Sequence, residues 1–148
     1  MKKLVLLCCS LLLVLSASAK GSKDPSKWSI SVTKNGDMYN VVFHVFLDAN
    51  WHIWSLNPGG DGSLIGPSFE FKTGKFSLVD RPGEQGIAVE SDFDGITGKV
   101  RYYFHEVQFN QLIKAHKGEI ITGTYTYQLC SEKMCLPPKT IPFKIKIP

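Results

Sequence analysis

The stretch that indicates the fold is WSISVTKNGDMYNVVFHVFL, residues 28–47. Apolar and polar residues alternate over residues 28–33 and again over residues 39–47. A period of two is that of a β-strand with one buried face. Between the two runs stands Asn35-Gly36, a pair typical of the tight turn that joins two antiparallel strands. The stretch therefore predicts an antiparallel β-hairpin.

The rest of the chain repeats this pattern in shorter pieces. No stretch shows a helical period, and turn residues recur between the apolar runs, as at Thr73-Gly74. Many short alternating strands of this kind predict an all-β fold, an immunoglobulin-like antiparallel β-sandwich that residues 28–148 form as a single domain. The further strands are expected over residues 51–56, 69–71, 76–79, 100–109, 120–129 and 141–147.

The first residues have the composition of a secretory signal peptide. Residues 1–3 are Met-Lys-Lys, residues 4–15 are apolar apart from one serine, and residues 16–19 are Ser-Ala-Ser-Ala. We expect cleavage after Ala19, a flexible leader over residues 20–27, and export to the periplasm or otherwise out of the cytoplasm. The apolar run is shorter than the roughly 20 residues that span a bilayer, and no later run is longer. No transmembrane segment is therefore expected in the mature chain.

The layout of the signal peptide argues against a lipoprotein, and the net charge argues against a nucleic-acid-binding protein. Lipid attachment at Cys8 or Cys9 would leave too few residues for a complete apolar segment, so we expect no lipoprotein. The full chain has a net charge of +4, and without Lys2 and Lys3 it keeps 15 basic and 13 acidic residues, a net charge of +2. Nucleic-acid binding needs a concentrated basic face, so no nucleic-acid partner is expected.

Removal of the signal peptide leaves two cysteines, Cys130 and Cys135. A strand is expected to run into Cys130, whereas Pro137 and Pro138 cannot continue a central β-ladder because they lack an amide hydrogen. The pair is therefore expected to flank a tight loop at the tip of a hairpin between the last two strands. In an oxidising compartment two cysteines this close in sequence are expected to form a disulfide.

Three functions are open for this pair. A structural staple across about six residues stabilises by about 2 kcal/mol, against nearly 5 for a loop of about 100 residues. The chain would then be a non-enzymatic binding module that uses loops such as residues 57–66. A redox pair would attack a partner disulfide with one thiolate and resolve the mixed disulfide with the other cysteine. Finally, Cys130, Met134 and Cys135 are soft ligands that suit Cu(I), whereas zinc usually takes four ligands.

A two-part signature surrounds the pair, Tyr127-Gln128-Leu129-Cys130 and Cys135-Leu136-Pro137-Pro138. It resembles the Y-Q-x-C and C-x-P-P motifs of the amino-terminal domain of the thiol:disulfide interchange protein DsbD. The resemblance implies an immunoglobulin-like redox carrier of the protein-disulfide reductase type, which passes reducing equivalents from a membrane reductase to periplasmic thioredoxin-like proteins. It implies Cys130 as the exchanging cysteine, Cys135 as the partner that closes the disulfide, and Tyr127 as a supporting residue. We expect no cofactor and no bound metal.

The chain resembles the free-standing members of this family, the disulfide-bond corrector proteins, more than the familiar fused protein. We therefore expect the electron donor to be a separate protein. The family covers its cysteines with a cap loop, and residues 94–99, DGITGK, fall in the matching place. The resemblance implies that Ile96 or Phe93 shields the pair and that Asp94 assists proton movement. His52-Ile53-Trp54 resembles the family's Tyr-x-Tyr, with His52 and Trp54 on one face by period two.

The sequence departs from the family in three places. The cysteine spacing is one residue shorter, Ile96 stands where Phe is usual, and Gly95 stands where an acid is usual. Simpler interpretations also stay open. They make Trp54 an ordinary core aromatic, His52 a surface or satisfied histidine without a catalytic role, and Asp94 a turn residue.

Overall fold

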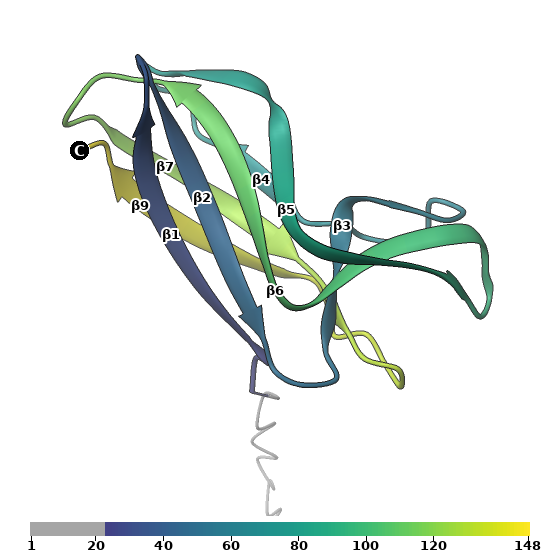
Figure 1. Ribbon diagram of the computed structural model, residues 1–148. Coiled ribbons are helices and arrows are strands. Elements are labelled where there is room, and N and C mark those ends of the chain that lie inside the picture. Colours follow the sequence, from purple (N-terminus) through teal and green to yellow (C-terminus); the bar gives the residue numbers. More distant parts are fainter. Residues whose placement is uncertain (1–22) are drawn as a thin grey trace, which may run out of the picture.

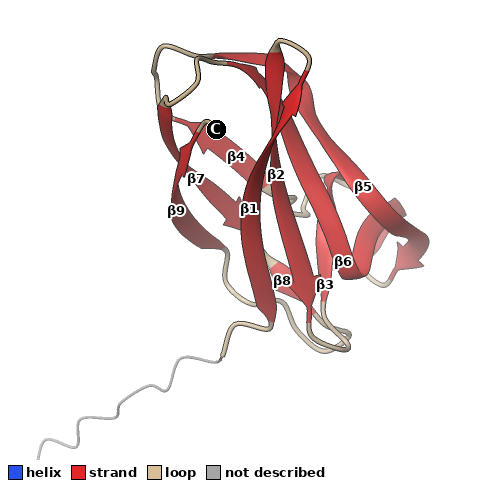
Figure 2. Ribbon diagram, turned by 60° about the vertical axis from the view of Figure 1, so that its left-hand side comes forward, coloured by secondary structure: helices blue, strands red, loops and turns tan. Residues whose placement is uncertain are grey.

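The computed structural model describes residues 23–148, and these form nine strands (Figure 2). The expected signal peptide, its cleavage site and the cysteines considered for lipid attachment lie outside the described residues. Within residues 23–148 no helix is long and apolar enough to cross a membrane. The strands are antiparallel and pack as two sheets in a sandwich, which confirms the all-β, immunoglobulin-like fold (Figure 1).

The first sheet contains six strands in the order β1-β2-β6-β3-β8, and β5 also pairs with β6. The expected hairpin is present, because β1 and β2 pair from Ser26↔Leu47 to Asn35↔Met38, and Gly36 adopts the positive φ of 59° at the turn. β1 begins at Ser26, inside residues 20–27, the range expected for a flexible leader. The bounds are β1 Ser26–Asn35, β2 Met38–Leu47, β3 His52–Gly59, β5 Ser77–Phe93, β6 Ile96–Lys114 and β8 Leu129–Cys130.

The second sheet has three strands, β4 Ser68–Phe71, β7 Ile120–Tyr127 and β9 Lys139–Lys146, in the order β4-β7-β9. The two short runs on either side of Thr73-Gly74 do not form a pair of their own. β4 pairs with β7 in the second sheet, whereas β5 pairs with β6 in the first. The chain therefore crosses between the sheets at this turn.

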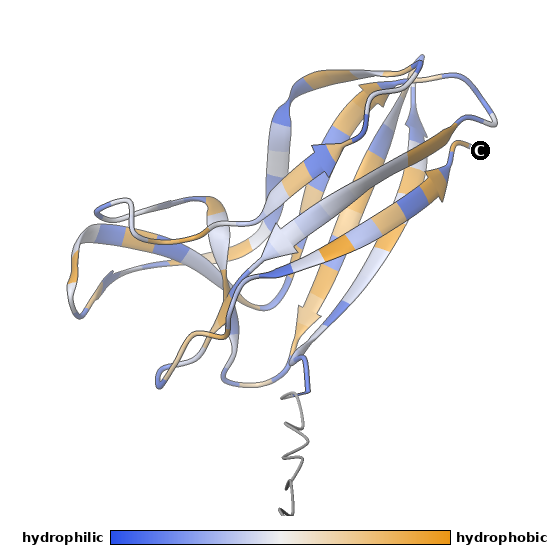
Figure 3. Ribbon diagram, turned by 180° about the vertical axis from the view of Figure 1, so that it is seen from behind, coloured by the Kyte–Doolittle hydropathy of each residue, from blue (hydrophilic) through white to orange (hydrophobic). Residues whose placement is uncertain are grey.

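The main core lies between the two sheets and is built from the inward face of each strand. Burial alternates along β2 and β7, as the sequence pattern predicts, and Figure 3 shows the matching bands of apolar and polar residues. Phe43 illustrates the packing, since its ring lies 4.4 Å from that of Phe69 and 5.2 Å from that of Phe143. The buried residues of the main core are Tyr39, Val41, Phe43, Val45, Leu47, Ile53, Tyr103, Val107, Phe109, Ile113, Ile121, Tyr125, Tyr127, Leu129, Phe143 and Ile147.

A long β5–β6 hairpin extends beyond the sandwich as an arm (Figure 1). From the sequence, strands were expected only over residues 76–79 and 100–109 of this hairpin, because residues 80–90 lack a clear alternation. β6 pairs with β2 over residues 106–113 and with β3 over residues 100–104. His105, with a positive φ of 62°, stands where one partner gives way to the other. The outer part of β6 is thereby free to turn away from β2 and carry the arm over β3.

The run expected as one strand over residues 120–129 is divided between the two sheets. β7 ends at Tyr127 in the second sheet, and Leu129–Cys130 then pair with β3 in the first. This change of sheet brings the first cysteine beside β3 instead of leaving it on the strand that the alternation predicts. It decides which residues surround the cysteine pair.

Candidate active site at the cysteine hairpin

Cys130 and Cys135 form a disulfide at the tip of a short hairpin, with their Cα atoms 4.0 Å apart. The amide of Leu136 donates to the carbonyl of Leu129 at 2.8 Å on one side of the pair, and the amide of Ser131 donates to the carbonyl of Met134 at 2.8 Å on the other. The cysteines thus occupy the close, non-hydrogen-bonded position of an antiparallel ladder, where side chains stand nearest to each other. Main-chain pairing alone places the two sulfurs within bonding reach.

The turn beyond the disulfide is held by local hydrogen bonds. The hydroxyl of Ser131 donates to the carbonyl of Met134 at 3.2 Å and accepts from the amides of Lys133 and Met134, each at 3.3 Å. On the other side, the side-chain amide of Gln128 donates to the carbonyl of Leu136 at 3.1 Å. The hairpin therefore has its own supports besides the disulfide.

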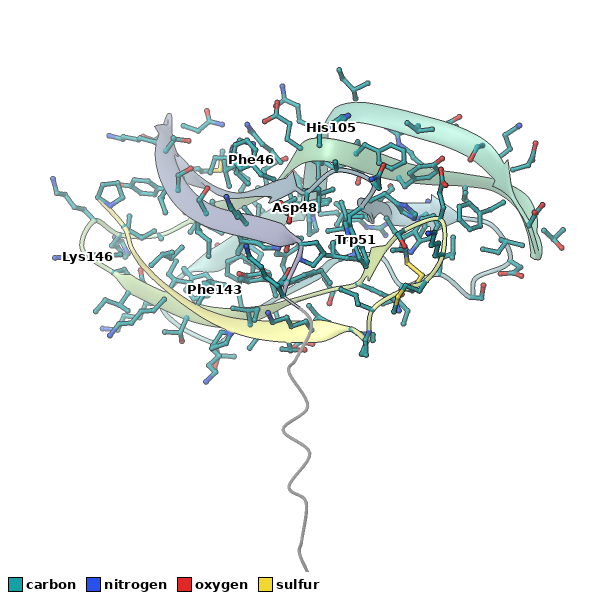
Figure 4. The ribbon with its side chains drawn as sticks, turned by 90° about the horizontal axis from the view of Figure 1, so that it is seen from below. Phe46, Asp48, Trp51, His105, Phe143 and Lys146 are labelled. Carbon is teal, nitrogen blue, oxygen red and sulfur yellow. A yellow bond between two sulfur atoms is a disulfide. The ribbon has the colours of Figure 1, made fainter. Side chains whose placement is uncertain are left out.

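The two faces of β3 separate the main core from the cysteine site. Ile53 pairs with Tyr103 and Leu129, and all three belong to the main core. His52 pairs with Phe104 and Cys130 on the opposite face. Directly paired residues share a face because side chains alternate along a strand. Cys130 consequently points away from the second sheet, and in Figure 4 the disulfide lies apart from Phe143 of the main core.

A second group of buried side chains covers this outward face, and we call it the outer cluster. Residues His52 to Ser55 are all buried, so β3 is covered on both faces, unlike the alternating β2. The outer cluster consists of buried Trp54, Val100, Tyr102 and Cys130, with the partly buried residues Leu64, Val89, Phe93, Ile96 and Phe104 packed against them. The ring of His52 lies against it, 4.8 Å from Trp54 and 4.8 Å from Tyr102.

The two cysteines differ sharply in exposure. Cys130 is 1% exposed within the outer cluster, whereas Cys135 is an exposed residue on the surface side of the hairpin. Met134 beside it is 56% exposed. A molecule approaching from solvent therefore meets Cys135 first.

The tip of the β5–β6 arm lies over the cluster in the manner of a cap. Phe93 and Ile96 pair across the Asp94-Gly95 turn, and both pack against the outer cluster. The loop after β3 supports this tip, because the amide of Gly60 donates to the carbonyl of Lys99 at 3.0 Å. A Cβ atom on Gly60 would come within 2.7 Å of the Ile96 side chain, so a glycine permits the close approach. Both residues expected to shield the pair thus lie at the cap.

His52 is neutral in this environment. Burial lowers the pKa of His52 to about 4, because removal from water disfavours the imidazolium. Its Nε2 atom has no hydrogen-bond partner among residues 23–148, nor has the Nε1 atom of Trp54. His52 is therefore neither a surface histidine nor a satisfied one, and Trp54 lies in the outer cluster and not in the main core.

Two further residues singled out by the sequence are Asp94 and Tyr127. Asp94 is exposed at the arm turn. Tyr127 belongs to the main core and donates its hydroxyl hydrogen to Asp24, which also accepts from Lys139. Burial by itself raises the pKa of Asp24, but the hydrogen bonds from Lys139, Tyr127 and Ser26 outweigh it and hold that pKa below its ordinary value. Tyr127 thus fastens the chain just before β1 instead of contacting the cysteines.

Several members of the outer cluster were missed by the sequence analysis. Val100, Tyr102, Phe104 and Leu64 carry no motif. One available signal was the run Trp51-His52-Ile53-Trp54, which is bulky on both faces and predicts a strand covered on both sides. Among the described residues there is no group of three or more His, Cys, Asp or Glu side chains arranged to hold a metal ion.

Comparison with known proteins agrees with this geometry. The family "Thiol:disulfide interchange protein DsbD, N-terminal" matches residues 22–146, which is most of the chain. The N-terminal periplasmic domain of ScsB from Proteus mirabilis is 19% identical, with a TM-score of 0.64 over 84% of this chain. The chain spans 47% of that protein, about half its length.

A second solved structure is the complex between the DsbD N-terminal and the PilB N-terminal domains from Neisseria meningitidis. It is 20% identical, with a TM-score of 0.51, and the match covers 79% of this chain and 80% of that chain. At these identities the likeness shows a shared fold. No curated protein sequence matches the chain.

Proposed function

This chain belongs to the family of DsbD amino-terminal domains, and we propose that it is a periplasmic carrier of reducing equivalents that exchanges the Cys130–Cys135 disulfide with partner thiols. The observation that carries the proposal is the asymmetric placing of the pair. One cysteine is exposed at the tip of a hairpin, and the other is buried in the outer cluster. Exchange requires that a partner thiol can reach one of the two sulfurs, and the exposed cysteine meets this requirement.

A purely structural role accounts less well for the hairpin. Its strands are already joined by main-chain hydrogen bonds on both sides of the disulfide, and Ser131 holds the turn. Closing a loop of about six residues stabilises by only about 2 kcal/mol. The pair also lies outside the main core. A structural disulfide inside the main core would have connected the two sheets.

Burial supports an assignment of roles that reverses the one implied by family resemblance. The resemblance implies Cys130 as the exchanging cysteine, but Cys130 is 1% exposed and lies beneath the cap. Cys135 is exposed. Because attack on a disulfide requires access to one sulfur, we assign Cys135 to the mixed disulfide with the partner and Cys130 to its resolution.

The chemistry then proceeds in two balanced steps. A thiolate of the reduced partner attacks Cys135 Sγ, a bond forms between the partner sulfur and Cys135, and the bond to Cys130 breaks. The electron pair of the broken bond stays on Cys130 Sγ as a thiolate. The partner's second thiolate then attacks its own sulfur in the mixed disulfide and releases Cys135 as a thiolate. The partner dithiol is oxidised by two electrons, the Cys130–Cys135 pair is reduced by two, and the reverse sequence delivers them onward.

The partners we propose are a membrane reductase as electron donor and periplasmic thioredoxin-like proteins as acceptors. Two similarities support this choice. The DsbD N-terminal domain has been solved in complex with the PilB N-terminal domain, and the similar ScsB domain is described as periplasmic. A signal peptide cleaved after Ala19 would bring this chain to the same compartment.

Trapping identifies both the partners and the exchanging cysteine. In a periplasmic extract, Cys130→Ser should accumulate mixed disulfides through Cys135, and Cys135→Ser should accumulate far fewer, because its remaining thiol is buried. Mass spectrometry of the trapped species names the partners. The reduction potential of the wild-type pair is the second measurement. A value below about −300 mV, typical of inert structural disulfides, would contradict the carrier function.

A further inference from the structure

The outer cluster contains two buried nitrogen atoms without a hydrogen-bond partner among residues 23–148, His52 Nε2 and Trp54 Nε1. His52 is 2% exposed and Trp54 is 1% exposed, and the centroids of their rings lie 4.8 Å apart. Buried polar groups are nearly always paired, because an unpaired one costs free energy. Two neighbouring exceptions beside a redox cysteine indicate groups that gain their partner in another state of the protein.

Cys130 is the group beside them whose hydrogen-bonding capacity changes with redox state. His52 is its directly opposite residue across the β3–β8 ladder, and Trp54 shares the outer cluster with it. Opposite residues of an antiparallel pair have Cβ atoms about 5 Å apart, within reach of a ring nitrogen. A disulfide sulfur is a weak acceptor, whereas a thiolate accepts charge-assisted hydrogen bonds.

We propose that the side-chain N–H groups of His52 and Trp54 are the hydrogen-bond donors that stabilise the Cys130 thiolate whenever the disulfide is open. The inference rests on the proposed exchange function. When a partner thiolate attacks Cys135, the Cys130–Cys135 bond breaks and its electron pair passes to Cys130 Sγ without a proton. The negative charge then arises inside an apolar cluster, where fixed N–H donors act most strongly.

The chemistry of the two side chains favours donation over proton transfer. Indole N–H is a donor only. Burial lowers the pKa of His52 to about 4, so its neutral ring is a poor base at neutral pH but can present an N–H at Nε2. The hydroxyl of Tyr102, another polar group of the cluster, is already paired with that of Ser91 at 3.2 Å. His52 and Trp54 are therefore the donors left for the sulfur.

Charged groups around the cluster do not supply this stabilisation. Glu84 of β5 is partly buried, but its carboxylate accepts from the Ser55 hydroxyl and the Leu56 amide and has no hydrogen to donate to a sulfur. The other charges on the surrounding segments are exposed, and at the arm Lys99 already pairs with Asp92 at 3.1 Å. Exposed charges are strongly screened by solvent. These exposed residues are Asp61, Glu90, Asp92, Asp94, Lys99, Arg101, Glu132 and Lys133.

The pKa of the Cys130 thiol is the direct measure. In a Cys135→Ser background, which leaves one thiol to titrate, it can be followed by the carbon-13 shift of Cys130 Cβ. His52→Phe and Trp54→Phe keep an aromatic ring in place but remove the N–H. Each should raise the Cys130 pKa by about one pH unit, because a hydrogen bond to a charged group stabilises it by about that amount. His52→Gln, which retains a side-chain N–H, should bring the Cys130 pKa most of the way back from the His52→Phe value to the wild-type value. His44→Phe, on β2, which β6 and β3 separate from the strand of Cys130, should leave the Cys130 pKa unaltered.

Exchange kinetics with both cysteines present test the same point. Reduction of the disulfide by glutathione should slow several-fold in His52→Phe and Trp54→Phe, because a leaving thiol of higher pKa leaves more slowly. One measurement needs no variant. The nitrogen-15 NMR signal of the His52 Nε2–H should shift when the disulfide of the wild-type protein is reduced. This measurement decides the matter even if a variant does not fold.

The outcomes separate the two proposals. If glutathione reduces the wild-type pair normally, but both variants keep the wild-type Cys130 pKa or the His52 signal does not respond to reduction, this inference is overturned and the carrier function stands. If the wild-type pair cannot be reduced at all by thiols, the carrier function fails and the inference fails with it.

Discussion

The main core and the outer cluster lie on opposite faces of the same strand and are built differently. Ile53 of β3 faces the main core, whose buried side chains are apolar or aromatic, and His52 and Trp54 face the outer cluster. The main core is formed by two sheets, whereas the outer cluster is covered by a hairpin arm and a loop. The main core holds the fold together, and the outer cluster maintains an environment for one sulfur atom.

Stability and function therefore depend on different residues of this domain. A residue of the main core can be removed only at the cost of the sandwich, because its contacts come from both sheets. A residue of the outer cluster is expected to change the behaviour of Cys130 before it affects the fold. Four substitutions or treatments test that division, from the largest effect on stability to the smallest.

Removal of a central ring should unfold much of the protein. Phe43 is 1% exposed and packs against Phe69 and Phe143, so Phe43→Ala should lower the free energy of unfolding by about 4 kcal/mol. Denaturant titration measures this loss. Phe46→Ala, at a position 46% exposed on the same strand, is the matched control and should change stability by less than about 0.5 kcal/mol. A loss below about 1 kcal/mol in Phe43→Ala would contradict the assignment of the main core.

Acidification should act through the outer cluster. The folded pKa of His52, about 4, lies below its ordinary value of 6.5, so the unfolded chain binds a proton that the folded one excludes. Stability from this residue is complete above about pH 6.5 and is lost as the pH falls toward 4, by about 3 kcal/mol. His52→Phe should lack this loss when unfolding is measured at several pH values. His116→Gln, at an exposed position, should retain it.

Reduction of the disulfide should weaken the domain without unfolding it. The loop between Cys130 and Cys135 is short and its hairpin has hydrogen bonds of its own, so the loss should be about 2 kcal/mol. Denaturant titration with and without a reducing agent measures it, with circular dichroism as the check on folding. Unfolding on reduction alone would mean that the pair is a staple that the domain cannot release.

The smallest effect concerns the attachment of the chain before β1. Asp24→Asn removes the acceptor charge for Lys139 and Tyr127 and should cost about 1 kcal/mol, because this site is partly exposed and screened. The folded pKa of Asp24 is lowered, so the wild-type advantage exists above about pH 4 and disappears as the pH falls through the folded pKa. Asp37→Asn in the exposed β1–β2 turn should show neither change.

Much of the sandwich could be predicted from local pattern, while the arm could not. The first hairpin and the alternation of β2 depend on residues close in sequence, and the structure contains both. The turn itself lies one residue later than predicted, because Asn35 pairs with Met38 as the last residue of β1 and Gly36 and Asp37 form the turn. β5 contains Pro82, Gly83 and Gly86, which weaken strand propensity. It is nevertheless a strand because β6 offers it a long pairing edge. Tertiary pairing here overrides the local preference.

The candidate site shows the same limit. His52 and Trp54 lie on one face, as period two predicts, and Phe93 and Ile96 pack against the outer cluster. A shielding role for Phe93 and Ile96 stays a prediction. Family resemblance implied Tyr127 as a supporting residue, and that role stays a prediction. The chain changes sheets between Tyr127 and Cys130, so the tyrosine lies in the main core. A sheet change alters neighbours without altering the alternation that the sequence displays.

The β class, the first hairpin and the two cysteines that can meet follow from the amino-acid sequence alone, because each depends on side-chain period, turn chemistry or short separation. The burial of Cys130, the exposure of Cys135 and the pairing of His52 with Cys130 in the outer cluster arise from tertiary packing. The solvent exposure of a side chain depends on which other segments pack over it. The segments that cover Cys130 come from β3, the β5–β6 arm and the loop after β3, which lie between about 30 and 80 residues away in the chain and meet only when the sheets assemble.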